Sequence, residues 1–126
     1  MKILFFLFIS FANAQSVTWT EKVLIPDTVL NNTSKSATYS FAASSGFSLQ
    51  TNITCAGACS VIVKISGSVD GINYSEITDL TKTYIATTTA LYNVYMQFFQ
   101  WMKVDIQESS GNNATIKAII GSKTQI

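Results

Sequence analysis

The chain has no histidine and no arginine, and its 126 residues include only two cysteines and one proline. Without histidine, the Ser-His-Asp and Cys-His nucleophile systems are excluded, and so are zinc sites with histidine ligands. Two cysteines alone cannot hold a zinc ion, and the acidic residues are too sparse for a calcium loop. The sequence therefore predicts a protein that is not an enzyme and has no catalytic residues, no metal site and no cofactor.

Charge is also scarce, since charged residues make up 12% of the chain and the formal net charge is +1. An average soluble protein has roughly twice that charged fraction. All eight basic residues are lysines spread along the chain, whereas binding to nucleic acid depends on clustered lysine and arginine. We therefore expect no nucleic-acid partner. A surface with so few charges is weakly protected against association with its own copies.

The first 14 residues contain the three parts of a secretory signal peptide in the expected order. Lys2 supplies a positive charge, residues 3–11 form the apolar run ILFFLFISF, and residues 12–14 match the A-x-A cleavage pattern. The apolar run is about half of the roughly 20 residues that a membrane-spanning helix needs. We expect a signal peptide over residues 1–14, one domain over residues 15–126, and no membrane span after cleavage. The expected location is extracellular, in the cell envelope or on a virion surface.

Export into an oxidising compartment makes a disulfide the expected state of the two cysteines. Cys55 and Cys59 lie in the segment CAGAC, with three small residues between them. A redox-active C-x-x-C motif has two intervening residues and begins a helix, so this alternative fits less well. The bond is predicted to hold a tight turn between two strands, and the small closed loop should add little global stability.

Alternation of apolar and polar residues predicts a series of short strands. The expected strands cover residues 17–25, 38–41, 47–53, 61–69, 72–78, 96–108 and 114–120. The only proline, Pro26, is predicted to end the first strand, because it has no backbone N–H for a ladder hydrogen bond. Loops or turns are expected at residues 31–35, 44–46, 70–71 and 109–113.

Residues 81–94 are ambiguous: their threonines favour a strand, but apolar residues from Leu91 to Phe99 have a spacing that also allows one helical turn. With seven or eight short strands and no clear helix, the predicted fold is all-β, an antiparallel β-sandwich. Jelly-roll and immunoglobulin-like topologies both fit. The Cys…Trp…Cys spacing of a true immunoglobulin domain is missing.

Aromatic residues before and within the strand over residues 96–108 are the candidate binding or interface site. They are Tyr92, Tyr95, Phe99 and Trp101. Phe99 and Trp101 are predicted to lie on the strand face opposite Met102, Val104 and Ile106, so that they could contact another chain or a sugar ring. The competing interpretation is that loops cover this face and the aromatic residues belong to the core. On the same face, Lys103 and Asp105 are expected to form a surface ion pair.

Two segments resemble hairpins of discoidin-like and phage virion β-sandwich domains. Residues 66–77 (SGSVDGINYSEI) follow the pattern S-x-D-G-x-x-aromatic-x-x-aliphatic, matched by Ser68, Asp70, Gly71, Tyr74 and Ile77. Residues 98–123 resemble the closing hairpin of such domains, with Lys103 where family members often have arginine. The resemblance implies the sandwich fold and a non-enzymatic role, and it implies no substrate.

These observations favour an exported structural or attachment module on a virion or cell surface that associates with its own copies or with other surface proteins. The alternative is a carbohydrate-binding module with glycans as partners. An assembly protein should be oligomeric whether or not sugars are present, whereas a sugar-binding module should be retained on a polysaccharide column and released by free glycan.

The exported protein is predicted to begin at Gln15, because signal peptidase recognises small residues such as Ala12 and Ala14. Replacing Ala14 with a bulky residue should leave the precursor uncut. The intact mass of the exported protein checks this expectation, and an exported chain that retains Met1 would contradict it.

Overall fold

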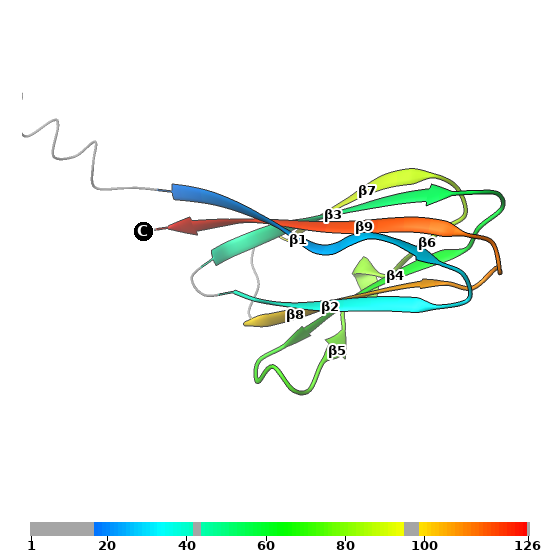
Figure 1. The fold of residues 1–126 in the computed structure, drawn as a ribbon. Helices are drawn as coiled ribbons and strands as arrows, with labels where there is room; N and C mark the ends of the chain where they lie inside the picture. Colours follow the sequence, from blue (N-terminus) through cyan, green and yellow to red (C-terminus); the bar gives the residue numbers. More distant parts are fainter. Residues whose placement is uncertain (1–16, 42–43, 95–98, 126) are drawn as a thin grey trace, which may run out of the picture.

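The structure of the chain, a computed structural model, describes residues 17–41, 44–94 and 99–125. These residues form two antiparallel sheets that face each other (Figure 1). The first sheet has the strand order β1 (Val17–Leu30), β9 (Ala114–Gln125), β3 (Ser44–Cys55), β7 (Thr88–Val94). The second sheet has the order β2 (Ser34–Ser40), β8 (Trp101–Glu108), β4 (Val61–Ser68), β5 (Ser75–Glu76), and β6 (Lys82–Tyr84) also pairs with β4. One short 3₁₀ helix, η1 (Thr78–Leu80), lies between β5 and β6.

The strand order decides between the two topologies that the sequence leaves open. Strands β1 to β4 alternate between the two sheets, and so do β7, β8 and β9. In an immunoglobulin fold the first two strands belong to one sheet, whereas here β1 pairs with β9. The fold is therefore an antiparallel β-sandwich of the jelly-roll type, in which β5 and β6 share one position beside β4.

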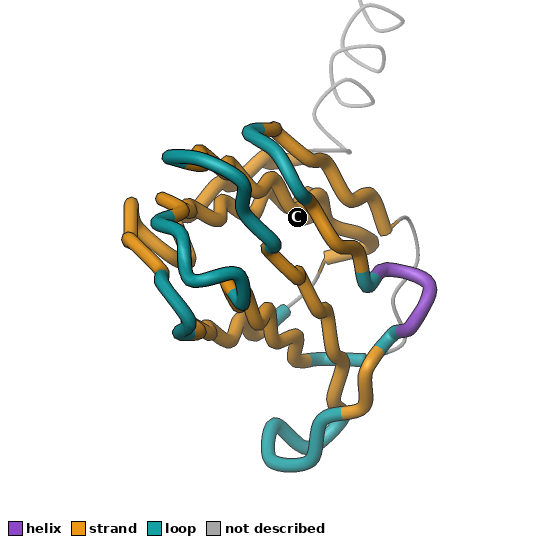
Figure 2. Tube along the Cα trace, turned by 90° about the vertical axis from the view of Figure 1, so that its right-hand side faces the viewer, coloured by secondary structure: helices purple, strands orange, loops and turns teal. Residues whose placement is uncertain are grey.

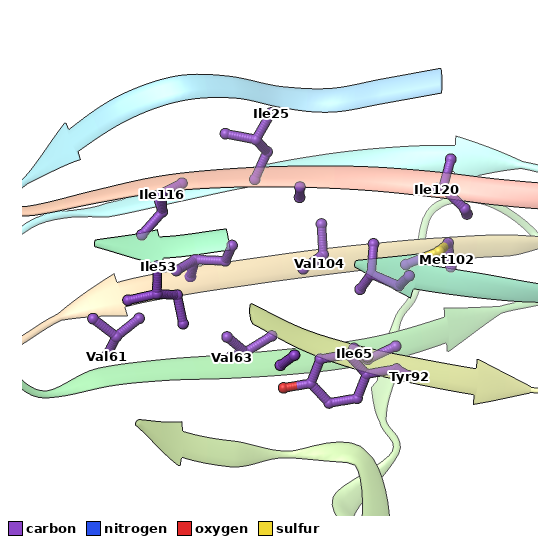
Figure 3. Close-up of a cluster of buried hydrophobic side chains, with 14 of the residues drawn as sticks. Ile25, Ile53, Val61, Val63, Ile65, Tyr92, Met102, Val104, Ile116 and Ile120 are labelled. Atoms are coloured by element: carbon purple, nitrogen blue, oxygen red, sulfur yellow. The ribbon is translucent and has the colours of Figure 1, made fainter. Parts of the chain in front are cut away.

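The core lies between the sheets and is built from alternate residues of each long strand (Figure 3). In β8, for example, Met102, Val104 and Ile106 are fully buried, while the residues between them are partly exposed. The other fully buried large apolar residues are Ile25, Leu49, Ile53, Val61, Val63, Ile65, Ile116 and Ile120. The predicted all-β sandwich is confirmed, with nine strands among the described residues rather than seven or eight.

The prediction that Pro26 ends the first strand is wrong, because β1 continues to Leu30. The pairing of β1 with β9 shifts register between Val23 and Ile25 and again between Ile25 and Thr28. Pro26 lies in the second irregularity, on the edge strand of the first sheet. A bulge on an edge strand tolerates the missing N–H, so the proline bends the strand without stopping it.

Several other predicted boundaries are also wrong. The loop expected at residues 31–35 is shorter, since β2 begins at Ser34, and the turn expected at residues 44–46 belongs to β3. The return strand expected over residues 72–78 is only two residues long, in β5, and the final strand runs on to Gln125. Residues 88–94 form a strand and not the alternative helical turn. Residues 96–98, at the start of the predicted strand over residues 96–108, lie outside the described residues, and β8 itself begins at Trp101.

The predicted disulfide is present between Cys55 and Cys59, whose Cα atoms are 5.8 Å apart. It closes the turn that leads from β3 in the first sheet to β4 in the second sheet. Cys59 is buried against the core. The bond therefore holds one of the crossings between the sheets at the end of the sandwich where Glu108 also lies.

Glu108 is fully buried at the end of β8, and it is the only buried charged side chain among the described residues. Its carboxylate accepts hydrogen bonds from the Oγ of Ser110 at 2.6 Å and from the backbone N–H groups of Ser60 at 3.1 Å and Gly111 at 2.9 Å. The backbone N–H groups of Ser110 and Asn32 also donate to it, at 2.9 and 3.4 Å. One carboxylate thus joins the loops β1–β2, β3–β4 and β8–β9, and we call this set of contacts the Glu108 network.

The charge of Glu108 is stabilised by these donors. Burial alone would raise the pKa of the carboxyl. Hydrogen bonds from the hydroxyl and N–H of Ser110 and from the N–H groups of Ser60 and Gly111 outweigh this effect and lower the pKa to about 2. Because the pKa in the folded state is below the ordinary value of 4.5, Glu108 stabilises the fold above about pH 4.5. That contribution should be lost as the pH falls from 4.5 to about 2.

Glu108→Gln should lower the melting temperature at pH 7 by on the order of 10 °C, because the amide brings a donor into a site made of donors. The variant should also lose less stability than the parent between pH 4.5 and pH 2. Asp105→Asn, three residues earlier on the partly exposed face of β8, is the matched control and should change little. Equal melting temperatures and equal acid profiles for Glu108→Gln and the parent would contradict the role given to the network.

Candidate interaction surfaces

The loop between β4 and β5 (residues 69–74) is held in one conformation by Asp70, and we call it the Asp70 loop. The Asp70 carboxylate accepts hydrogen bonds from the backbone N–H groups of Ile72 and Asn73, both at 2.8 Å. The side-chain amide of Asn73 and the hydroxyl of Ser68 donate to it as well, at 2.9 Å each. The pKa of Asp70 is well below its usual range. The backbone N–H groups of Asn73 and Ile72 have the largest effect, and the two side-chain donors have a smaller one. The predicted Asp-Gly turn is therefore a rigid loop (Figure 2, teal, at the bottom).

The Asp70 loop folds over Trp101, which is a predicted interface residue. Gly71 has a φ of +75°, and a Cβ at this position would lie 2.8 Å from Cε2 of the Trp101 indole. Both the left-handed backbone and the close approach require glycine. Nearby, the Lys103 ammonium lies 5.5 Å from the ring centroid of Tyr74 in the same loop. Trp101 does lie on the strand face opposite Met102, as expected, but the loop covers part of it.

Phe99 lies on the core side and not beside Trp101. Its ring is edge-on to those of Phe41 and Phe47, with centroids 6.2 and 6.3 Å away, at one end of the sandwich. The prediction that Phe99 shares a face with Trp101 is wrong, because β8 begins at Trp101 and its alternation does not extend back to residue 99. Phe99 also lines a hollow of about 440 Å³ together with Asn73 and Glu76.

Tyr92 also lies among the core residues, where it is 5% exposed (Figure 3). Its hydroxyl is 2.6 Å from that of Tyr84 in β6, so this pair links the two sheets. Burial, and then the hydrogen bond to Tyr84, raise the pKa of Tyr92. Tyr95 lies outside the described residues. Of the four predicted interface residues, the structure therefore places Tyr92 and Phe99 in or against the core and Trp101 under a loop.

Sequence reasoning missed the outer face of the first sheet, which carries several exposed apolar side chains. Val23 pairs with Ile119, Ile119 with Gln50, and Gln50 with Leu91, so these residues form one row across all four strands. Val23 is 46% exposed and Leu91 is 61% exposed. Three of its four residues are apolar and the fourth, Gln50 in β3, is polar. We call this row the apolar row.

Trp19 extends this apolar surface toward one end of the first sheet. It is 52% exposed, and its indole lies flat on Gly121, where a Cβ would clash with the ring. Toward the other end, Val29 is 59% exposed. The signal in the sequence was present, since Trp19 and Val23 are spaced by an even number of residues on one strand face.

The outer face of the second sheet is polar by contrast. Lys103 and Asp105 form the predicted ion pair, with Nζ 3.7 Å from Oδ2, and Lys64 lies 4.0 Å from Glu76. None of the exposed large apolar residues lies in the strands of this sheet, within the part of the chain that the structure describes. The two outer faces therefore differ in chemistry, because the exposed large apolar side chains of the described strands all belong to the first sheet, three to β1 and one to β7.

Neither a metal-binding cluster nor a membrane-spanning helix occurs in the part of the chain that the structure describes. No three acidic or cysteine side chains lie close enough together there to hold a metal ion. Likewise, no helix in that part of the chain has the length and apolar character needed to cross a bilayer.

No protein family matches the chain in sequence, and no curated protein does so either. Solved structures share its fold. The exported protein XepA of PBSX superimposes with a TM-score of 0.60 at 7% identity, over 82% of this chain and 36% of that one. A protein of the disulfide-linked pili that form Bacillus endospore appendages has a TM-score of 0.53 at 13% identity, over 89% and 91% of the two chains. The SPBc2 prophage-derived protein YomS has a TM-score of 0.52 at 12% identity, over 85% and 96%.

At these identities the likeness concerns the fold alone. It confirms the resemblance to phage-type β-sandwich proteins that the two hairpin segments indicate. The hairpin over residues 66–77 becomes β4, the Asp70 loop and β5. The prediction of a closing hairpin is wrong, because its two strands, β8 and β9, lie in different sheets and do not pair with each other.

Trp101→Ala should free the Asp70 loop, because the indole supports Gly71. We expect faster hydrogen exchange at the N–H groups of Ile72 and Asn73, and a loss of about 2 kcal/mol in the free energy of unfolding. Gln107→Ala, on the same face of β8 but away from the loop, is the matched control. Unchanged exchange in the loop of the Trp101 variant would show that the indole does not support it.

Proposed function

We propose that this chain is an exported, non-catalytic structural subunit that associates with its own copies, or with other surface proteins, on a virion or a cell surface. The observation that carries the proposal is the exposed apolar outer face of the first sheet, with Trp19, Val23, Val29 and Leu91. Water contact with so much apolar surface is unfavourable, and exposed patches of this kind commonly mark contacts with another protein. Within this proposal, the polar second sheet faces solvent.

Export is part of the proposal and rests on the N-terminal sequence. The expected signal peptide ends at Ala14, and the first described strand begins at Val17. Removal of residues 1–14 would therefore take no residue from β1. The disulfide between Cys55 and Cys59 agrees with an oxidising destination.

A carbohydrate-binding module is the alternative, and the hollow beside Phe99 favours it. This hollow combines an aromatic ring with polar groups from Asn73, Ser75 and Glu76, a combination that suits sugar hydroxyls and ring faces. In that case the mature protein should be retained on a polysaccharide column and released by free glycan. A subunit of a surface assembly should pass through the column and remain oligomeric in the presence of the glycan.

The mature protein should be oligomeric by native mass spectrometry and sedimentation, and Val23→Lys should weaken association at least about tenfold, because it places a charge in the apolar row. Ile72→Lys is the matched control, since Ile72 is 80% exposed but lies in the Asp70 loop. Both variants should melt close to the parent. Equal effects of the two substitutions on association would contradict the assignment of this face.

A further inference from the structure

The free edge of β7 lacks the features by which proteins usually prevent pairing with another chain. Edge strands are normally protected by charged residues, proline, bulges or short length. Residues 88–94 (TTALYNV) contain no charge and no proline. The pairing of β7 with β3 runs without a shift from Phe47 opposite Val94 to Ile53 opposite Thr88. Among the described strands, only β3 pairs with β7, which forms one margin of the first sheet (Figure 1).

The other edges of the sandwich carry such protection. At the far edge of the first sheet, β1 has Pro26 and two irregularities in its pairing. In the second sheet, β2 carries Lys35, and β5 and β6 are two and three residues long. Of the edges that the structure describes, β7 alone is regular, uncharged and seven residues long. It is therefore the edge that can accept another strand most readily.

We propose that β7 pairs antiparallel with β7 of a second copy of this chain, so that the first sheets of two copies become one continuous sheet. A two-fold contact of this kind places the same strand on both sides of the axis. The proposal rests on the self-association put forward above and names a second contact for it.

The side chains of β7 are complementary to themselves when Leu91 lies on the two-fold axis. Leu91, which is 61% exposed, then lies opposite the Leu91 of the other copy. On the same outer face, Thr89 lies opposite Asn93, two short polar side chains. On the inner face, the small Ala90 lies opposite the large Tyr92. Because β7 has no charged residue, no like charges oppose each other in this pairing. A strand with charged side chains would find no opposite charge on β7, so an uncharged strand such as a second β7 fits it better.

This pairing also accounts for the position of Leu91 at the end of the apolar row. Leu91 is the last residue of the row, at the β7 edge: its neighbour on β3 is Gln50, and no strand of the described chain lies on its other side. In the paired sheet, the row of one copy would continue into the row of the other. A two-fold contact between β7 edges joins two copies and cannot add a third. The outer face of the first sheet therefore remains available for further contacts.

Leu91→Cys tests the pairing directly, since both native cysteines are in the disulfide and the new thiol would be the only free one. Residues directly opposite in an antiparallel pair have Cα atoms about 4.5–5.5 Å apart, within the range of a disulfide. Under mild oxidation, Leu91→Cys should form a covalent dimer at least tenfold faster than Val69→Cys. Val69 is the matched control, because it is 76% exposed but lies in the Asp70 loop.

Equal rates of crosslinking for the two variants would overturn the β7 inference. If Val23→Lys disrupts association while Leu91→Cys gives no specific dimer, the proposed function stands and the edge contact is wrong. If Leu91→Cys crosslinks specifically while Val23→Lys has no effect on association, the edge contact stands and the outer face is not a contact surface.

Discussion

The sandwich depends on a buried carboxylate at one end. Glu108 accepts hydrogen bonds from N–H donors in three loops that connect the two sheets, so the crossings β1–β2, β3–β4 and β8–β9 share one acceptor. Backbone donors that are buried without partners are costly, and a single ionised carboxylate satisfies several of them at once. The disulfide between Cys55 and Cys59 closes the middle loop of the three. Together they hold this end of the jelly roll, while hydrophobic contacts hold the centre.

The fold also decides which aromatic residues are available for contacts. A jelly roll has two outer faces, and the Asp70 loop covers part of Trp101 on the second sheet. On the first sheet, Trp19 is 52% exposed, and no loop of residues 17–41, 44–94 or 99–125 buries it. The exposed apolar side chains therefore lie on the opposite side of the sandwich from the face that Trp101 of β8 indicates. The outer face of the first sheet exposes Trp19, Val23 and Leu91, whereas the described strands of the second sheet expose no large apolar side chain, so the two outer faces of the molecule differ.

Period-two patterns were enough to predict the sandwich and the inward residues of β8, and the expected export was enough to predict the disulfide. They did not predict the correct side of the sheet for Phe99, because the sequence does not show that the strand begins only at Trp101. The burial of Glu108 could have been predicted, since it continues the spacing of Met102, Val104 and Ile106, and a donor-rich Ser-Ser-Gly turn follows it. The exposure of Val23 depends on which strands cover it, and strand order is set by long-range pairing that no local pattern contains. The same holds for the free edge of β7.

The accessibility of Trp19 tests the central claim, that the outer face of the first sheet is a contact surface. In a Trp101→Phe variant, Trp19 is the only tryptophan left after the signal peptide, and its fluorescence can be quenched by acrylamide across a range of protein concentrations. The account predicts that quenching falls as the protein associates, because the half-exposed indole becomes covered. Quenching that stays constant while the protein sediments as an oligomer would contradict it, since the copies would then associate through some other surface.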